Sequence, residues 1–253
     1  VGSVITGADI SGADFTNARL ARLRSGGMVN AHPPAVLPAP YLFIPNDASG
    51  AYIVGPYSDL SGANLVGSVF TGADISGTDF TNARLARLRS GGMVNAHPPA
   101  VLPAPYLFIP NDASGAYIVG PYSDLSGANL VGSAITGADI SGADFTNAQL
   151  ARLRSGGMVN THPPAALPAP YLFIPNDASG AYIVGPYSDL SGANLVGSTI
   201  TGADISGADF TNAQLARLRS GGMVNAHPPA ALPSPYLFIP NDASGAYIVG
   251  PYS

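Results

Sequence analysis

The segment DLSGANLVGSVFTGADISGTDFTNARL, residues 59–85, carries a large apolar residue at every fifth position, and a small residue stands two positions before each of them. A period of five matches neither the alternation of a strand nor the 3.6-residue period of a helix. Glycine and asparagine recur between the apolar positions, and both tolerate the positive φ that tight turns need. The segment therefore predicts a coil that turns a corner every five residues and stacks its apolar side chains inside.

The same pattern returns with a period of 65 residues, because the heptapeptide TGADISG occurs four times at that interval. Aligned at this period, the copies differ at only seven positions. Self-similarity of this kind is typical of solenoids. We predict a single repeat array over 1–253, with copies at 1–65, 66–130, 131–195 and 196–253. No copy looks like an atypical cap, which indicates a window of a longer array.

The pattern A-(D/N)-L-x-x in residues 59–85 resembles the pentapeptide-repeat family. The resemblance implies an all-β fold, a right-handed four-sided β-helix (a solenoid) with one pentapeptide on each side. Leu88 and Met93 extend the series after a three-residue step from Leu85, which gives eight apolar positions, or two turns, per copy. Aspartates such as Asp74 and Asp79 are expected to point outward. The predicted core comprises Ile10, Phe15, Leu20, Leu60, Leu65, Phe70, Ile75, Phe80, Leu85, Leu88 and Met93.

Residues 94–123 interrupt the period of five. The prolines of NAHPPAVLPAP favour extended chain. The following YLFIPNDASGAYIV predicts a β-hairpin, with strands at 106–109 and 116–119 around a turn at 110–115. Each repeat thus carries a hairpin arm. Two turns of coil and a two-stranded hairpin both span two strand spacings, about 10 Å. We therefore expect the arms of successive copies to join into one sheet alongside the coil.

Apolar residues stand at consecutive positions in both hairpin strands, which indicates burial on both faces. One face is expected to cover the coil. For the other face two alternatives stay open: it presents an apolar row to an outside partner, or the proline-rich segment folds over it. The first alternative predicts an assembly surface made by Tyr41, Phe43, Tyr52, Tyr106, Phe108 and Tyr117.

Composition excludes several function classes. The chain has no Cys, so it has no disulfide framework and no thiolate chemistry. Its 15 acidic residues are offset by 10 basic ones, which gives a net charge of −5. This balance fits neither a basic nucleic-acid footprint nor the dense negative charge of a DNA mimic. No apolar run of about 20 residues occurs, so no membrane span is predicted.

No constellation of catalytic residues is visible. Histidine occurs once per copy, at His32, His97, His162 and His227, and a single histidine does not supply the three or four ligands of a metal site. Rows of stacked aspartates lack the spacing of a calcium loop. Nucleotide-binding loops and a nucleophile motif are absent as well. We predict no catalytic, cofactor-binding or metal-binding residues and no enzymatic activity.

Nearly identical copies, sparse charge and an apolar arm favour a structural role. We expect a building unit of a filament, sheath or surface layer that associates with itself through the arms, at the cell surface or outside the cell. The alternative is a binding module, which either adheres to polysaccharide through tyrosine rows or protects a topoisomerase by mimicking DNA.

Overall fold

The computed structural model describes residues 1–30, 32–95, 97–160, 162–225, 227–241 and 244–252. The chain divides into two compact units, Val1–Leu125 and Ser126–Ser253, and each is described by itself. All regular structure in the described residues consists of short β-strands. The first unit contains β1 (Val4–Thr6), β2 (Arg24–Gly26), β3 (Leu42–Ile44), β4 (Tyr52–Val54), β5 (Val69–Thr71), β6 (Arg89–Gly91), β7 (Leu107–Ile109) and β8 (Tyr117–Val119). The second contains β9 (Leu172–Ile174), β10 (Tyr182–Val184), β11 (Thr199–Thr201), β12 (Arg219–Gly221), β13 (Leu237–Ile239) and β14 (Tyr247–Val249).

In the coil segments the chain returns to the same place every 20 residues. The parallel pairs β1–β2, β5–β6 and β11–β12 all have this offset, as in Val69 opposite Arg89. Single parallel bridges outside the strands keep it, as at Asn64 with Arg84 and Asn194 with Gln214. Twenty residues are four segments of five, so four positive-φ corners separate each residue from its pairing partner.

The corners repeat at the expected period. Every fifth residue has a positive φ, beginning with Gly62 (69°), Gly67 (74°) and Gly72 (75°). This left-handed conformation costs glycine no steric energy because glycine has no Cβ. Asparagine, arginine and tyrosine occupy some of the corners, as at Asn82, Arg87 and Tyr122.

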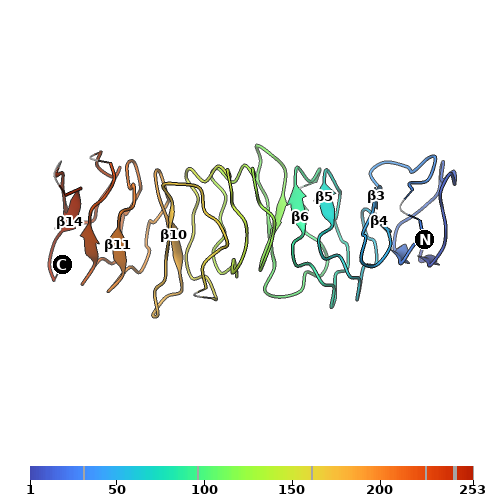
Figure 1. Cartoon of the computed structure of the whole chain (residues 1–253), viewed down its shortest axis with the longest axis horizontal. Coiled ribbons are helices and arrows are strands. Elements are labelled where there is room, and N and C mark those ends of the chain that lie inside the picture. The colour runs from blue at the N-terminus through green and yellow to red at the C-terminus, as the bar shows by residue number, and fades with distance from the viewer. Residues whose placement is uncertain (31, 96, 161, 226, 242–243, 253) are drawn as a thin grey trace. The chain divides into compact units, whose positions relative to one another are not determined.

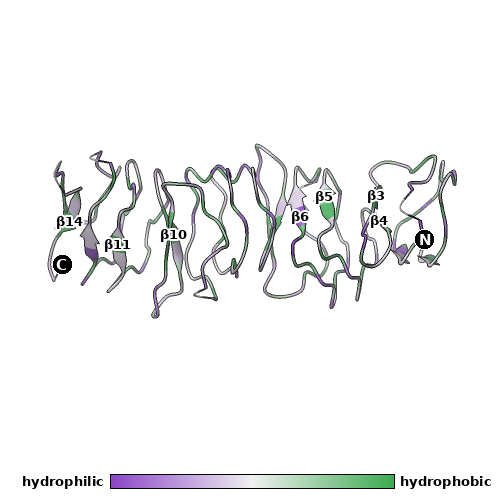
Figure 2. Ribbon diagram, viewed as in Figure 1, coloured by the Kyte–Doolittle hydropathy of each residue, from purple (hydrophilic) through white to green (hydrophobic). Residues whose placement is uncertain are grey.

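Apolar side chains at the period of five fill the inside of the coil. Phe70 and Phe80, which are half a turn apart, are fully buried, with ring centroids 6.0 Å apart. Ala73 is equally buried and leaves room for the larger side chains. Along the ribbon, hydrophobic and hydrophilic residues alternate at short intervals (Figure 2). Of the predicted core residues, Phe15 is half-buried and packs against the cluster of the first coil; those buried are Ile10, Leu20, Leu60, Leu65, Phe70, Ile75, Phe80, Leu85, Leu88 and Met93.

Each copy also contains the predicted hairpin. The antiparallel pairs are β3–β4, β7–β8, β9–β10 and β13–β14, and several of their strands are marked in Figure 1. Among the described residues every hairpin is a separate two-stranded sheet. The expectation of one continuous sheet alongside the coil is therefore wrong. The physical reason is visible in the first unit, where the coil of the second copy packs between the hairpins β3–β4 and β7–β8.

Candidate functional site

The hairpin β3–β4 is a layer with two buried faces. Ala51 and Ile53 belong to the apolar cluster of the coil that precedes the hairpin. Ile44, Tyr52 and Val54 belong to the cluster of the coil that follows it. Successive residues of a strand point to opposite faces, so the consecutive apolar residues of YIV serve two coils at once. In the second unit Ile174, Tyr182 and Val184 likewise pack with the following coil.

A buried serine joins the hairpin to the coil of its own copy. The Ser25 hydroxyl donates to the carbonyl oxygen of Ile53 and accepts from the Ile53 N–H, both at 2.9 Å. Ser155 does the same for Ile183, at 3.0 and 2.9 Å. One hydroxyl thus pairs both the N–H and the carbonyl oxygen of a buried strand residue. Leaving either group buried without a partner would cost about 1–3 kcal/mol of stability.

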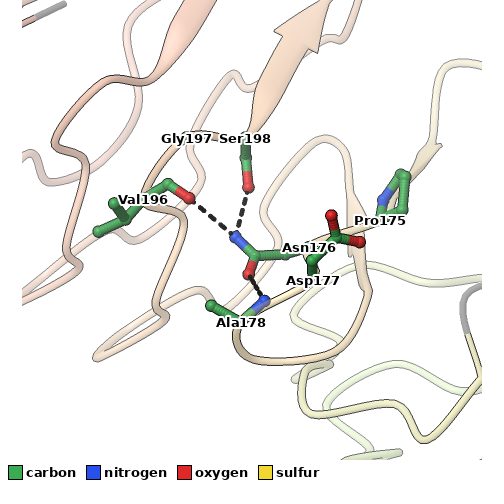
Figure 3. A pocket seen from close by; sticks show the side chains of 7 residues that line it. All are labelled: Pro175, Asn176, Asp177, Ala178, Val196, Gly197 and Ser198. Atoms are coloured by element: carbon green, nitrogen blue, oxygen red, sulfur yellow. Dashed lines mark hydrogen bonds between the residues drawn. The ribbon is translucent and has the colours of Figure 1, made fainter.

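A buried asparagine joins the hairpin to the next copy. Asn176 Nδ2 donates to the carbonyl oxygen of Val196 (3.2 Å) and to Ser198 Oγ (2.8 Å). Its Oδ1 accepts from the backbone N–H groups of Ala178 and Ser179, which closes the hairpin turn. Figure 3 shows this amide between the two segments. The residues around it line a cavity of about 360 Å³.

The same junction is present in the first unit. Asn46 Nδ2 donates to Val66 O at 3.0 Å and to Ser68 Oγ at 2.8 Å, and the side chain of Asn46 is only 7% exposed. The Tyr52 hydroxyl accepts from the N–H of Asn64 and donates to Ser49 Oγ. Two copies therefore meet through hydrogen bonds of Asn46 and Tyr52 and through the apolar contacts of the hairpin.

These contacts show where the residues predicted to form an assembly surface lie. Tyr52 and Tyr117 are buried. The expectation that they form an outward apolar row is wrong, and for Tyr52 the physical reason is that the following coil covers that face of the hairpin. Half-buried positions are occupied by Tyr41, Phe43, Tyr106 and Phe108.

Tyr41 packs inward at the base of the hairpin. Its hydroxyl donates to the carbonyl oxygen of Pro56 at 3.0 Å, and its ring lies so close to Gly55 that an added Cβ there would come within 2.2 Å of it. Burial, with a smaller contribution from the negative charge of Asp74, raises the pKa of Tyr41. The corresponding burial beside Asp204 raises the pKa of Tyr171 to about 12.

The aspartates do not all point into solvent as expected. Asp74 is buried, because Asn95 covers it and donates to its Oδ2 at 2.6 Å; Asp79 is half-buried. For Asp204, burial alone would raise the pKa, but hydrogen bonds from Ser206 and Asn225 outweigh it and the pKa is lowered. All four histidines are exposed. In the part of the chain that is described, no group of three His or Asp side chains is arranged to hold a metal ion.

The sequence model of the family described as pentapeptide repeats matches residues 57–86, 122–152 and 187–217, with eight copies of the repeat. These segments are pentapeptide repeats. Each of them begins near the end of one copy and continues into the coil of the next, and none includes a hairpin strand, so the family model recognises the coil and not the hairpin. No curated protein and no solved structure matches the chain. Within the described residues, no helix has the length and hydropathy needed to span a membrane.

Proposed function

We propose that the chain is a structural building unit that associates head to tail into a filament, sheath or surface layer outside the cell. The observation that carries the proposal is the two-sided hairpin, which binds its own coil through Ser25 and the coil of the next copy through Asn46. The second unit repeats the arrangement with Ser155 and Asn176. The coil itself is proposed to be a right-handed four-sided β-helix, supported by the 20-residue return and the corner at every fifth residue.

The junction joins two different surfaces, a hairpin face and a coil face. A contact of this heterologous kind leaves each partner with an unused surface of the opposite type, so association continues into an open filament unless a ring closes. With only 10% of residues charged, repulsion between chains is weak. These properties support growth by repetition of one contact.

The hairpin β13–β14 gives the proposal a sharp test. Ile239 is 42% exposed, whereas its counterparts Ile44 and Ile174 are about one-tenth as exposed, at 4% and 5%, because a following coil covers them. A polypeptide of residues 1–253 contains no coil after β13–β14, so in this polypeptide we expect the hairpin to bind the coil face of a second copy in the same way. Ile239→Asp places a charge in that contact and is expected to abolish assembly.

Val224→Asp is the matched control. Val224 is 66% exposed and its counterparts Val29, Val94 and Val159 are between 52% and 67% exposed, so no copy buries this position in the junction. Sedimentation velocity and negative-stain electron microscopy are expected to show long assemblies for the unaltered chain and the control, and monomers for Ile239→Asp. The proposal would be overturned if the unaltered chain stayed monomeric at high concentration, or if Ile239→Asp and Val224→Asp assembled to the same extent.

A further inference from the structure

Two corners of the coil carry large side chains where glycine is the usual residue. Arg22 and Tyr57 lie at neighbouring corners, one above the other in the stack of turns, since the Arg22 N–H donates to the carbonyl oxygen of Tyr57 at 2.9 Å. Both have a φ of 58°. In the second unit Arg152 and Tyr187 repeat the pair, with the same 2.9 Å hydrogen bond.

The tyrosine ring at this corner lies on a glycine. A Cβ added to Gly77 would come within 2.5 Å of the Tyr57 ring, and one added to Gly207 would come equally close to Tyr187. The absence of a side chain at Gly77 and Gly207 therefore lets the ring lie against the backbone of the next turn. The tyrosines nevertheless stay 59% and 57% exposed. Each ring is thus held in place and still accessible to a ligand.

Beside each ring is a cavity with charges of both signs. In the first unit Tyr57 lines it together with Arg22, Arg24, Asp59 and Asp79, around a volume of about 650 Å³. In the second unit Arg152, Tyr187, Asp189 and Asp209 line a cavity of about 580 Å³. Corresponding residues therefore line a similar cavity in each of the two units.

The carboxylates in these cavities are fixed from one side. Asp59 Oδ1 accepts from the backbone N–H and the hydroxyl of Ser61, and Asp79 Oδ1 accepts from Thr81 in the same way. None of these bonds uses Oδ2. The bonds from Ser61 are the main reason that the pKa of Asp59 is lowered, so this carboxylate is an ionised acceptor near neutral pH.

We propose that these cavities are binding subsites for a neutral polysaccharide. Sugar hydroxyls both donate and accept, so they match guanidinium donors and carboxylate acceptors that stand side by side. The apolar face of a sugar ring packs on an accessible aromatic ring that is already held in place. The paired aspartates disfavour phosphate or sulfate groups, and the arginines disfavour cations.

Repetition strengthens this kind of binding. A polysaccharide presents the same sugar many times, and this chain presents the same cavity once in each unit. Once one subsite is occupied, the other binds at a high effective concentration, so weak individual contacts give a firm attachment. This inference is independent of assembly between chains, because each cavity is complete within one chain, where residues of two adjacent copies such as Arg22 and Asp79 line it together.

Native affinity electrophoresis of the full chain tests the proposal. Separate gels contain a mixed-linkage β-glucan, a galactomannan, a xylan or, as the anionic comparison, hyaluronan. We expect at least one neutral polysaccharide to retard the chain. Replacing the four corner tyrosines by glycine (Tyr57→Gly, Tyr122→Gly, Tyr187→Gly and Tyr252→Gly together) is expected to weaken binding by about 100-fold or more, because the linked subsites are lost together.

The matched control replaces four corner asparagines: Asn17→Gly, Asn82→Gly, Asn147→Gly and Asn212→Gly. These residues have the same left-handed backbone, with φ of 56–60°, so the control introduces the same glycines without removing a ring, and its retardation should equal that of the unaltered chain. A tyrosine-to-asparagine set, which also tolerates this conformation, replaces the glycine set if circular dichroism shows that the latter is unfolded. Retardation by no neutral polysaccharide, by hyaluronan alone, or equally in the tyrosine and asparagine sets would overturn the proposal.

Discussion

The junction between copies predicts a large effect from one buried amide. In Asn176→Ala the hydroxyl of Ser198, which is only 4% exposed, loses the Nδ2 donor at 2.8 Å, and the carbonyl oxygen of Val196 loses the same donor at 3.2 Å. The N–H groups of Ala178 and Ser179 lose an acceptor but lie nearer to solvent. A buried polar group left without a partner costs about 1–3 kcal/mol and a lost hydrogen bond about 1 kcal/mol, so we expect local destabilisation of about 2–4 kcal/mol.

Hydrogen exchange measured by mass spectrometry reports this local opening directly. A loss of about 2–4 kcal/mol corresponds to about 30- to 900-fold faster exchange, and we expect it in peptides covering 171–184 and 194–200. Asn176→Asp separates the two roles of the amide. Its carboxylate still accepts from Ala178 and Ser179 but presents an oxygen instead of a donor to Val196 O, so the junction is expected to open while the turn stays closed.

Asp177→Asn is the control for this experiment, because it makes the reverse exchange at the adjacent, exposed position. Surface substitutions of this kind change stability by less than about 0.5 kcal/mol, so exchange should stay within about twofold of the unaltered chain. The reasoning is refuted if Asn176→Ala exchanges within that same range, or if Asp177→Asn opens the junction equally.

Gly185→Ala brings a Cβ within 2.1 Å of the Tyr171 ring and is expected to lower the free energy of unfolding by about 1–3 kcal/mol through overpacking. Gly192 has open space around it and a φ of 69°, so Gly192→Ala should lower that free energy by about 1–2 kcal/mol from backbone strain alone. Urea titrations of the two variants measure the difference, and the account of Tyr171 packing fails if Tyr171→Ala does not relieve the cost of Gly185→Ala. Tyr171 has a pKa of about 12 in the folded chain against 10.0 for the free side chain. The stability that the folded chain gains from burying the protonated phenol is therefore complete below pH 10 and is lost as the pH rises towards 12. Alkaline titration of tyrosinate absorbance should show a late-titrating class that becomes smaller in Tyr171→Phe; titration of all tyrosines together near pH 10 would contradict it.

The coil was predictable because its signal is local. Large residues at Leu60, Leu65 and Phe70 must all point inward, and only a five-residue corner period allows this, so the sequence pattern and the fold carry the same information. The hairpin strands were predictable for the same reason, from YLFI and AYIV around PNDASG.

The position of the hairpin was not predictable in this way. The pattern correctly indicated two buried faces, but it did not identify what covers the second one. Tyr52 looks like a partner-binding residue when its own copy is considered alone. The residues that bury it, such as Leu60 and Leu65, come from the next copy. The motif PNDASG likewise predicts only a turn at Asn46, since an asparagine that closes a turn and an asparagine that also donates to Ser68 of the next copy have the same sequence context.

The two-sided hairpin also explains why the copies have to resemble one another. Each hairpin must fit its own coil through Ala51 and Ile53 and the following coil through Tyr52 and Val54. A change on either surface therefore alters a contact between copies, and it is tolerated only if the neighbouring copy offers the matching surface. Two of the variable positions fit this constraint: Arg84 and Val101, which correspond to Gln149 and Ala166, are exposed or half-buried side chains outside the contact. Two others do not, because Phe70 and Thr78, which replace the Ile and Ala of the other copies, are buried, and Thr78 donates to the carbonyl oxygen of Gly55 beside the hairpin. Copies that share one junction can then be added without designing a new interface, which is the property that a structural repeat protein requires.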